Sequence, residues 1–246
     1  MHNTLQIATF NIHKGVSSFN ARLVLHKQRE LIRILNADVV FLQEVRGAHV
    51  RHRKLTLGGQ HEFLADSIWP DFVYGQNVVT TSGHHGNAIL SKFPIMHWAN
   101  EDISASTSER RGLLHCEIAI PSWDQHLHCI CVHLGLFARW RRQQLAALNS
   151  HINSLVPRNA PLIIAGDFND WRQKAGGILA EQQHLKEVFE VAQGKHARSF
   201  PSLLPLLKLD RIYTRGFHVQ HSQVHGGTLF AKVSDHAALS ASLLRL

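Results

Sequence analysis

The chain has 246 residues, of which 44% are hydrophobic and 18% charged, a composition typical of folded soluble proteins. No apolar run reaches about 18 residues, so the sequence predicts no membrane-spanning helix. The net charge of +8 favours anionic partners such as nucleic acid, anionic lipid head groups or phosphorylated small molecules, and it does not choose among them.

The chain contains no internal repeat, low-complexity tract or Pro/Gly-rich linker, and we expect one domain over residues 1–246. Its start lacks a basic stretch followed by an apolar one, so we expect a cytoplasmic protein. Cys116, Cys129 and Cys131 are expected to be buried reduced thiols, because no C-x-x-C pair suggests a zinc site. Most of the 20 histidines lie in polar segments and are expected at the surface.

Hydrophobic patterning predicts strands separated by two long helices. In chain order the elements are a strand at 5–10, a helix at 21–35 capped by Asn20, strands at 38–43, 87–90, 114–120 and 126–132, a helix at 138–154, and strands at 162–165, 210–213 and 237–243.

Several of these strands end in a polar residue that suits metal or phosphate binding. Asn11, Glu44, His133 and Asp167 each follow a predicted strand. Polar groups repeated at strand ends indicate that they gather at one edge of the sheets, where an active site is expected.

The candidate site residues combine four carboxylates, two amides and two imidazoles: Asn11, Glu44, His133, Asp167, Asn169, Asp210, Asp235 and His236. Neither a G-x-S-x-G elbow nor a glycine-rich phosphate loop accompanies them. Oxygen ligands without thiolates suit a hard cation, Mg²⁺ or Mn²⁺, and the remaining acids and imidazoles suit proton transfer.

Seven motifs in order resemble the endonuclease/exonuclease/phosphatase superfamily, the metal-dependent phosphodiesterases related to pancreatic DNase. They are ATFNIH (8–13), LQEV (42–45), GNAILS (86–91), CVHLGL (131–136), AGDFND (165–170), LDRIY (209–213) and VSDHAAL (233–239). The resemblance implies a four-layer α/β sandwich, with two mostly antiparallel sheets flanked by helices and the site at one edge.

The resemblance also implies roles for the matching residues. Glu44 is similar to the family's main metal ligand, with Asn11 and Asp235 beside it. His236 would act as general base or contact the scissile phosphate, and Asp210 would hold its tautomer. The remaining assignments are Asp167 for the attacking water or the leaving group, Asn169 and His133 for phosphate oxygens, and Asn87 and Arg111 for substrate binding.

Some residues keep a structural alternative. Asp170 is expected to serve a turn. His84 and His85 are expected in a loop before GNAILS, with a contact to the substrate phosphate as the alternative. The alternative to a site role for Asp210 is a surface ion pair with the adjacent Arg211. For Arg111, a position on a solvated face is as well supported as contact with the substrate.

We expect an anionic phosphodiester substrate, nucleic acid first and a phospholipid or phosphoinositide head group as the alternative, with no obligate protein partner and a monomeric chain. The segment LFARWRRQQ (136–144) mixes rings and guanidiniums that suit either substrate, or an ordinary helix start. The segment SFPSLLPLLKLD (199–210) is either a core-packing loop or an apolar lip for acyl chains.

Overall fold

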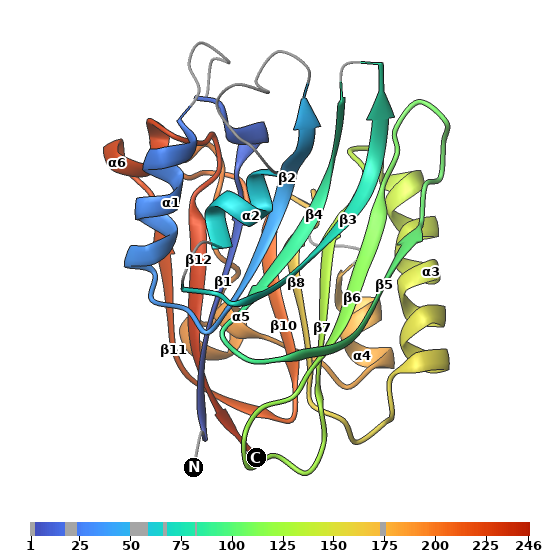
Figure 1. Cartoon of the computed structure of the whole chain (residues 1–246). Helices are drawn as coiled ribbons and strands as arrows, with labels where there is room; N and C mark the ends of the chain where they lie inside the picture. Colours follow the sequence, from blue (N-terminus) through green and yellow to red (C-terminus); the bar gives the residue numbers. More distant parts are fainter. Residues whose placement is uncertain (1–2, 18–23, 50–58, 66–67, 82, 173–175) are drawn as a thin grey trace.

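Two six-stranded sheets lie face to face in the computed structural model, which describes residues 3–17, 24–49, 59–65, 68–81, 83–172 and 176–246 (Figure 1). The first sheet has the order β11 (Phe217–His225), β12 (Ala238–Arg245), β1 (Thr4–Asn11), β2 (Val39–His49), β4 (Gly83–Ser91) and β3 (Asp71–Thr80). The second has the order β5 (Ile95–Asp102), β6 (Gly112–Ile118), β7 (Leu127–His133), β8 (Leu162–Asp167), β10 (Asp210–Arg215) and β9 (Lys186–Glu187).

Each sheet contains a single parallel pair at its middle, β1 with β2 and β7 with β8. All other neighbours pair in antiparallel fashion. The expected pair of mostly antiparallel sheets is confirmed.

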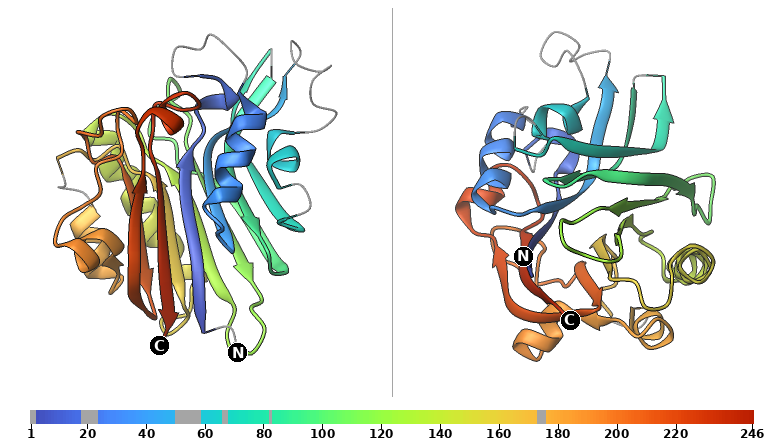
Figure 2. Two further views of the ribbon diagram at one scale, coloured as in Figure 1. Left: turned by 90° about the vertical axis from the view of Figure 1, so that its left-hand side faces the viewer. Right: turned by 60° about the horizontal axis from the view of Figure 1, so that its bottom comes forward.

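Helices cover both outer faces of the sandwich, as the two views of Figure 2 show. The outer face of the first sheet carries α1 (Leu25–Ile34), α2 (Gln60–Ala65) and the short α6 (Thr228–Ala231). The second sheet carries α3 (Ala138–Leu155) and α4 (Gly176–Gln182), while α5 (Val188–Gln193) packs near β10 and β11. A 3-10 turn, η1 (His13–Gly15), follows β1.

Alternation along the strands builds three apolar layers. In β1, Ile7 lies between the sheets, whereas Ala8 and Phe10 face the layer under α1. In β8, Ile163 faces the other sheet and Ile164 faces the layer under α3. Strands that are apolar on both faces therefore form the middle of each sheet, and four layers of elements follow.

Two details differ from or complete the sequence predictions. The helix predicted from residue 21 begins at Leu25 with Val24 as its cap residue, and Asn20 lies outside the described residues. Cys116, Cys129 and Cys131 are free and buried between the sheets, as expected.

Across the part of the chain that the structure describes, no helix combines the length and apolar character needed to cross a membrane.

Candidate active site

Strand register brings three predicted site residues into one row at the edge of the second sheet. His133 at the end of β7 lies opposite Asp167 at the end of β8, and Asp167 lies opposite Asp210 at the start of β10. Because directly paired residues point to the same face of a sheet, these three side chains lie side by side.

The first sheet supplies Asn11 and Glu44 at the same edge. Asn11 pairs with Gln43, and the next residue, Glu44, sits at an irregularity of β2 with a φ of 57°. The Asn11 amide Nδ2 lies 3.4 Å from Glu44 Oε1 and 3.3 Å from Asp167 Oδ2, donating toward both. Asn11 therefore joins the acidic groups of the two sheets.

His236 enters the site from the segment before β12. That strand is antiparallel to β1, so its first residues lie beside the end of β1. The Ser234 hydroxyl donates to the Asn11 carbonyl at 2.7 Å, and accepts from the His236 backbone N–H at 3.1 Å. His236 Nδ1 lies 2.9 Å from Asp210 Oδ2 and Nε2 lies 3.8 Å from Asp167 Oδ2.

The charges of this cluster oppose the effect of burial. Burial acts to lower the pKa of His236, but the carboxylates of Asp210 and Asp167 outweigh it and raise that pKa to about 10. Burial raises the pKa of Asp167 to about 6, against the opposing charge of His236. Burial and the charge of Arg111 hold the pKa of His133 well below its usual value. The site thus combines a cationic imidazole, a neutral imidazole and a carboxyl group that titrates near neutral pH.

A cavity of about 380 Å³ opens onto these groups. Six of the predicted residues line it: Glu44, Arg111, His133, Asp167, Asn169 and His236. Asn169, with a φ of 50°, donates from its side chain to the Leu134 carbonyl at 2.9 Å, and its backbone N–H donates to Asp167 Oδ1 at 2.9 Å. Asn11 and Asp210 do not line the cavity themselves. They contact two residues that do, Asn11 through Asp167 and Asp210 through His236.

Asp235 and Asn87 are not part of the cavity wall. Asp235 Oδ1 lies 3.2 Å from His13 Nδ1, beside η1. Asn87 is fully buried, and its Nδ2 donates to the carbonyls of Gly112 at 3.1 Å and Cys131 at 3.3 Å, which belong to the other sheet. The structure therefore gives Asn87 a contact between the sheets.

Arg111 and His85 both face the cavity. Arg111 pairs with Glu109 at 2.9 Å and donates from Nε to the Leu134 carbonyl at 3.3 Å. The loop expected for His84 and His85 is wrong, because both lie in β4. His84 Nδ1 is 2.9 Å from the Tyr74 hydroxyl, whereas burial lowers the pKa of the cavity-facing His85 to about 4.

Two further predictions concern acids next to the site. Asp210 does not form a surface ion pair with Arg211: the buried Arg211 donates to the Asp210 backbone carbonyl at 2.9 Å, and the carboxyl pairs with His236. Asp170 is buried, and its Oδ1 lies 3.8 Å from Arg141 Nη2. The other terminal nitrogen, Arg141 Nη1, donates to the Gly135 carbonyl at 3.2 Å. Asp170 thereby fixes the start of α3 to the segment after β8.

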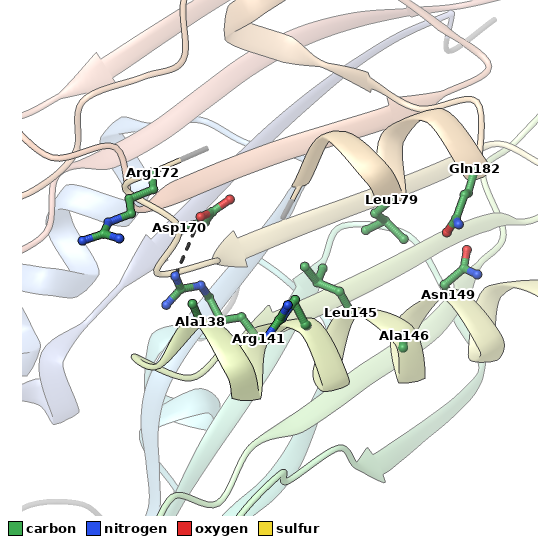
Figure 3. Close-up of a pocket in the computed structure, with 10 residues that line it drawn as sticks. Ala138, Arg141, Leu145, Ala146, Asn149, Asp170, Arg172, Leu179 and Gln182 are labelled. Atoms are coloured by element: carbon green, nitrogen blue, oxygen red, sulfur yellow. Dashed lines mark ion pairs between the residues drawn. The ribbon is translucent and has the colours of Figure 1, made fainter. Parts of the chain in front are cut away.

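Asp170 and Arg141 also line a second cavity, of about 630 Å³, between α3 and α4 (Figure 3). Arg141 lies over the Trp171 ring at 5.1 Å from its centroid, and Trp171 lines the first cavity. The two cavities are therefore neighbours on either side of this pair.

Sequence reasoning did not single out Lys14 and Trp171, which line the first cavity. The other apolar lining residues, Leu136, Phe200, Leu207 and Leu209, belong to the two segments named above as possible substrate contacts. Lys14 Nζ lies 3.6 Å from Glu44 Oε2. Lys14 directly follows the motif ATFNIH, which contains the predicted metal ligand Asn11. That position was a weak sign of a role at the site, since a cation beside a metal ligand is expected near a phosphate.

The site fits a hard cation by its donor chemistry. Among the described residues, the buried Glu44 Oε2 and Asp210 Oδ1 have no hydrogen-bond partner. Ligand atoms of Asp167, Asp210 and His236 also lie within 4.8 Å of one another. The 2.9 Å contact with Asp210 occupies His236 Nδ1, which leaves His236 Nε2 and the carboxylate oxygens as possible ligand atoms.

Comparisons with known proteins identify the family and the fold. The Endonuclease/Exonuclease/phosphatase family model matches residues 8–236. The protein YbhP of Escherichia coli (strain K12) is 45% identical over 244 residues, covering 98% of this chain and 96% of YbhP.

Two solved structures share the fold. An endonuclease/exonuclease/phosphatase from Beutenbergia cavernae superposes with a TM-score of 0.78 at 19% identity, covering 99% of this chain and 72% of that one. The mannosyl-6-phosphatase Bt3783 of Bacteroides thetaiotaomicron gives a TM-score of 0.73 at 16% identity, covering 98% and 99% of the two chains. Together with the family match, these findings show that the chain belongs to the endonuclease/exonuclease/phosphatase family of phosphoester hydrolases.

Proposed function

We propose that this protein hydrolyses phosphodiester bonds with the help of Mg²⁺ or Mn²⁺. The observation that carries the proposal is the buried Oε2 of Glu44, which has the Lys14 ammonium 3.6 Å away but no hydrogen-bond partner among the described residues, at a cavity that also presents His236, Asp167 and Asn169. When bound, the cation would neutralise charge on the phosphate and polarise its oxygens. Glu44 would hold it, with Asn11 and Asp235 nearby.

The chain's own groups suit the rest of the reaction. Asp210 accepts from His236 Nδ1 and so fixes the orientation of the ring, which leaves Nε2 near the reacting phosphate. Asp167, with its pKa raised by burial to about 6, suits the transfer of a proton from water or to the leaving oxygen. Asn169 and His133 line the cavity and suit hydrogen bonds to the phosphate.

The site is tested with bis-p-nitrophenyl phosphate, a soluble diester, in Mg²⁺ or Mn²⁺. Glu44→Gln and His236→Ala should each lower kcat by ~10² to 10³-fold, because each removes a group that acts on the transition state. Glu30→Gln, an exposed carboxylate of α1, is the matched control for Glu44 and should keep full activity. Full activity of either site variant would overturn the assignment.

Two substrate classes fit the proposal. Nucleic acid is supported by the net charge of +8 and by Lys14, His85 and Arg111 at the cavity. A phospholipid or phosphoinositide head group is supported by exposed leucines beside the same cavity. A panel of single- and double-stranded DNA, RNA, phosphoinositides and phospholipid vesicles separates the two, and nuclease activity should weaken steeply with salt. As the sequence leads us to expect, we also propose that the protein is a monomer and lies in the cytoplasm.

A further inference from the structure

We infer that the mouth of the catalytic cavity is a docking surface for an anionic phospholipid bilayer. This inference rests on the proposed function and deepens it, because it names the surface on which the substrate lies. The docking surface is an apolar rim formed by the exposed side chains of Leu136, Phe137, Trp171 and the leucines at 203, 204, 206 and 207.

The rim residues belong to one edge of the molecule. They follow β7, follow β8 and precede β10, three adjacent strands of the second sheet. Leu136, Trp171 and Leu207 also line the catalytic cavity, although each is at least 40% exposed. Lys14, just after β1, and Glu44, in β2, line the same cavity, so its wall combines charged and apolar side chains.

The leucines at 203, 204 and 206 are 58% to 67% exposed, at the tip of a loop whose base is fixed. Phe200 and Leu207 pair as an isolated bridge across that base. Ser202 donates from its backbone N–H to the Asp235 carbonyl at 2.7 Å and from its hydroxyl to the Ser234 carbonyl at 2.6 Å. The loop is thus attached to the segment that carries His236, while its apolar tip points to solvent.

Exposed cations accompany the apolar side chains. Arg139 follows Phe137 by two residues, Arg172 follows Trp171, and the half-buried Lys208 follows Leu207. Within the described residues none of these three cations forms an ion pair, whereas Glu109 and Asp170 are paired with other arginines. Apolar side chains flanked by such cations match a bilayer that bears anionic head groups, where the chains insert and the cations meet phosphate.

The composition of the rim favours a bilayer over nucleic acid. Single-stranded nucleic acid binds to aromatic platforms, on which its bases stack. Five of the seven exposed side chains are leucines, three of them at the tip of one loop, and a leucine offers no ring face. Leucines that remain exposed around a cavity lose contact with water once they enter an acyl layer.

The test measures binding to vesicles by sedimentation, in EDTA so that no hydrolysis occurs. The vesicles contain phosphatidylcholine with phosphatidylglycerol, or phosphatidylcholine alone. The variant carries Leu203→Ser, Leu204→Ser and Leu206→Ser. Its matched control carries Ile34→Ser, Leu155→Ser and Leu246→Ser, which replace three equally exposed side chains at the end of the molecule away from the cavity. Circular dichroism establishes that both remain folded.

The wild type and the control should bind the anionic vesicles, and the loop variant should bind them at least about tenfold more weakly. Binding to phosphatidylcholine alone should be weaker for all three proteins. Equal binding by the loop variant, or no vesicle binding by the wild type, overturns the inference. An oligonucleotide that binds the wild type and loses affinity for the loop variant, without vesicle binding, assigns the rim to nucleic acid. Failure of the proposed function is seen separately, as no hydrolysis of the soluble diester by the wild type.

Discussion

Gly166 shows why the residue before Asp167 has no side chain. Its φ is 147°, and a Cβ built there would lie 1.9 Å from the Val132 carbonyl oxygen in the neighbouring strand β7. Backbone atoms cannot move aside as a flexible side chain does, and the parallel pair of β7 and β8 fixes them. Glycine therefore allows Asp167 to stand opposite His133.

We expect Gly166→Ala to lower the free energy of unfolding by more than about 2 kcal/mol and to reduce hydrolysis, because the strand must move away and Asp167 moves with it. Urea unfolding at pH 7 measures the first effect. Gly177→Ala is the control, since a Cβ there meets nothing within 4 Å. An unchanged stability of Gly166→Ala would contradict this account.

Among the elements, the strands predicted from the sequence are those inside the sheets. The strands that the sequence did not reveal are β3, β5, β9 and β11, the four sheet edges. Edge strands have one open side and exposed faces, so polar residues interrupt their apolar pattern, as in β5 (Ile95–Asp102). The helices α2, α4, α5 and α6 were also missed, because none exceeds seven residues, too few to display a helical period.

Three linked histidines join helix α3 to the second sheet. The sequence analysis did not predict them, because it expected most histidines at the surface. His151 of α3 lies 2.6 Å from Glu101 through Nδ1 and 3.0 Å from His115 through Nε2. His115 in turn lies 3.0 Å from His128 in β7. All three imidazoles are buried. The chain satisfies polar groups beneath the helix, and burial lowers the pKa of His115 and of His128.

This arrangement predicts that acid weakens the fold. Burial, with the neighbouring histidines, lowers the pKa of His115 from 6.5 to about 3. The unfolded chain takes up a proton below pH 6.5 and the folded one does not, so stability is lost as the pH falls from 6.5 toward 3, by up to ~1.4 kcal/mol per pH unit. Urea unfolding between pH 7 and pH 4 measures the slope.

The comparison variant is His115→Gln, which cannot titrate. Its stability should fall less steeply than that of the wild type below pH 6.5, because the difference between the two isolates this one histidine. Parallel curves for the two proteins would mean that His115 does not contribute to the acid response.

At the level of the whole molecule, the site exists only where the two sheets meet. Glu44 and Asn11 come from the first sheet, whereas Asp167 and Asp210 come from the second. Three acids held close together repel one another, and a bound cation relieves that repulsion only in the folded state.

We therefore expect Mg²⁺ or Mn²⁺ to raise the melting temperature, and EDTA to reverse the rise. At a hundredfold excess over Kd the added stability is about 2.7 kcal/mol. Glu44→Gln should show a smaller rise than Glu30→Gln in differential scanning calorimetry. If both variants respond to the cation as the wild type does, Glu44 is not the main ligand.

The sequence by itself determined the family and the eight interior strands, and it pointed to six of the residues that line the cavity. These follow from side-chain chemistry and from local patterns, which the chain carries in its order. Only the tertiary structure decided that Asn87 lies between the sheets and that Lys14 lines the cavity. It also decided between alternatives that the sequence left open, since His85 faces the cavity and the leucines of the segment 199–210 stay exposed beside its mouth. These depend on contacts between residues distant in the chain, and on which apolar side chains remain uncovered after packing. No local pattern encodes either.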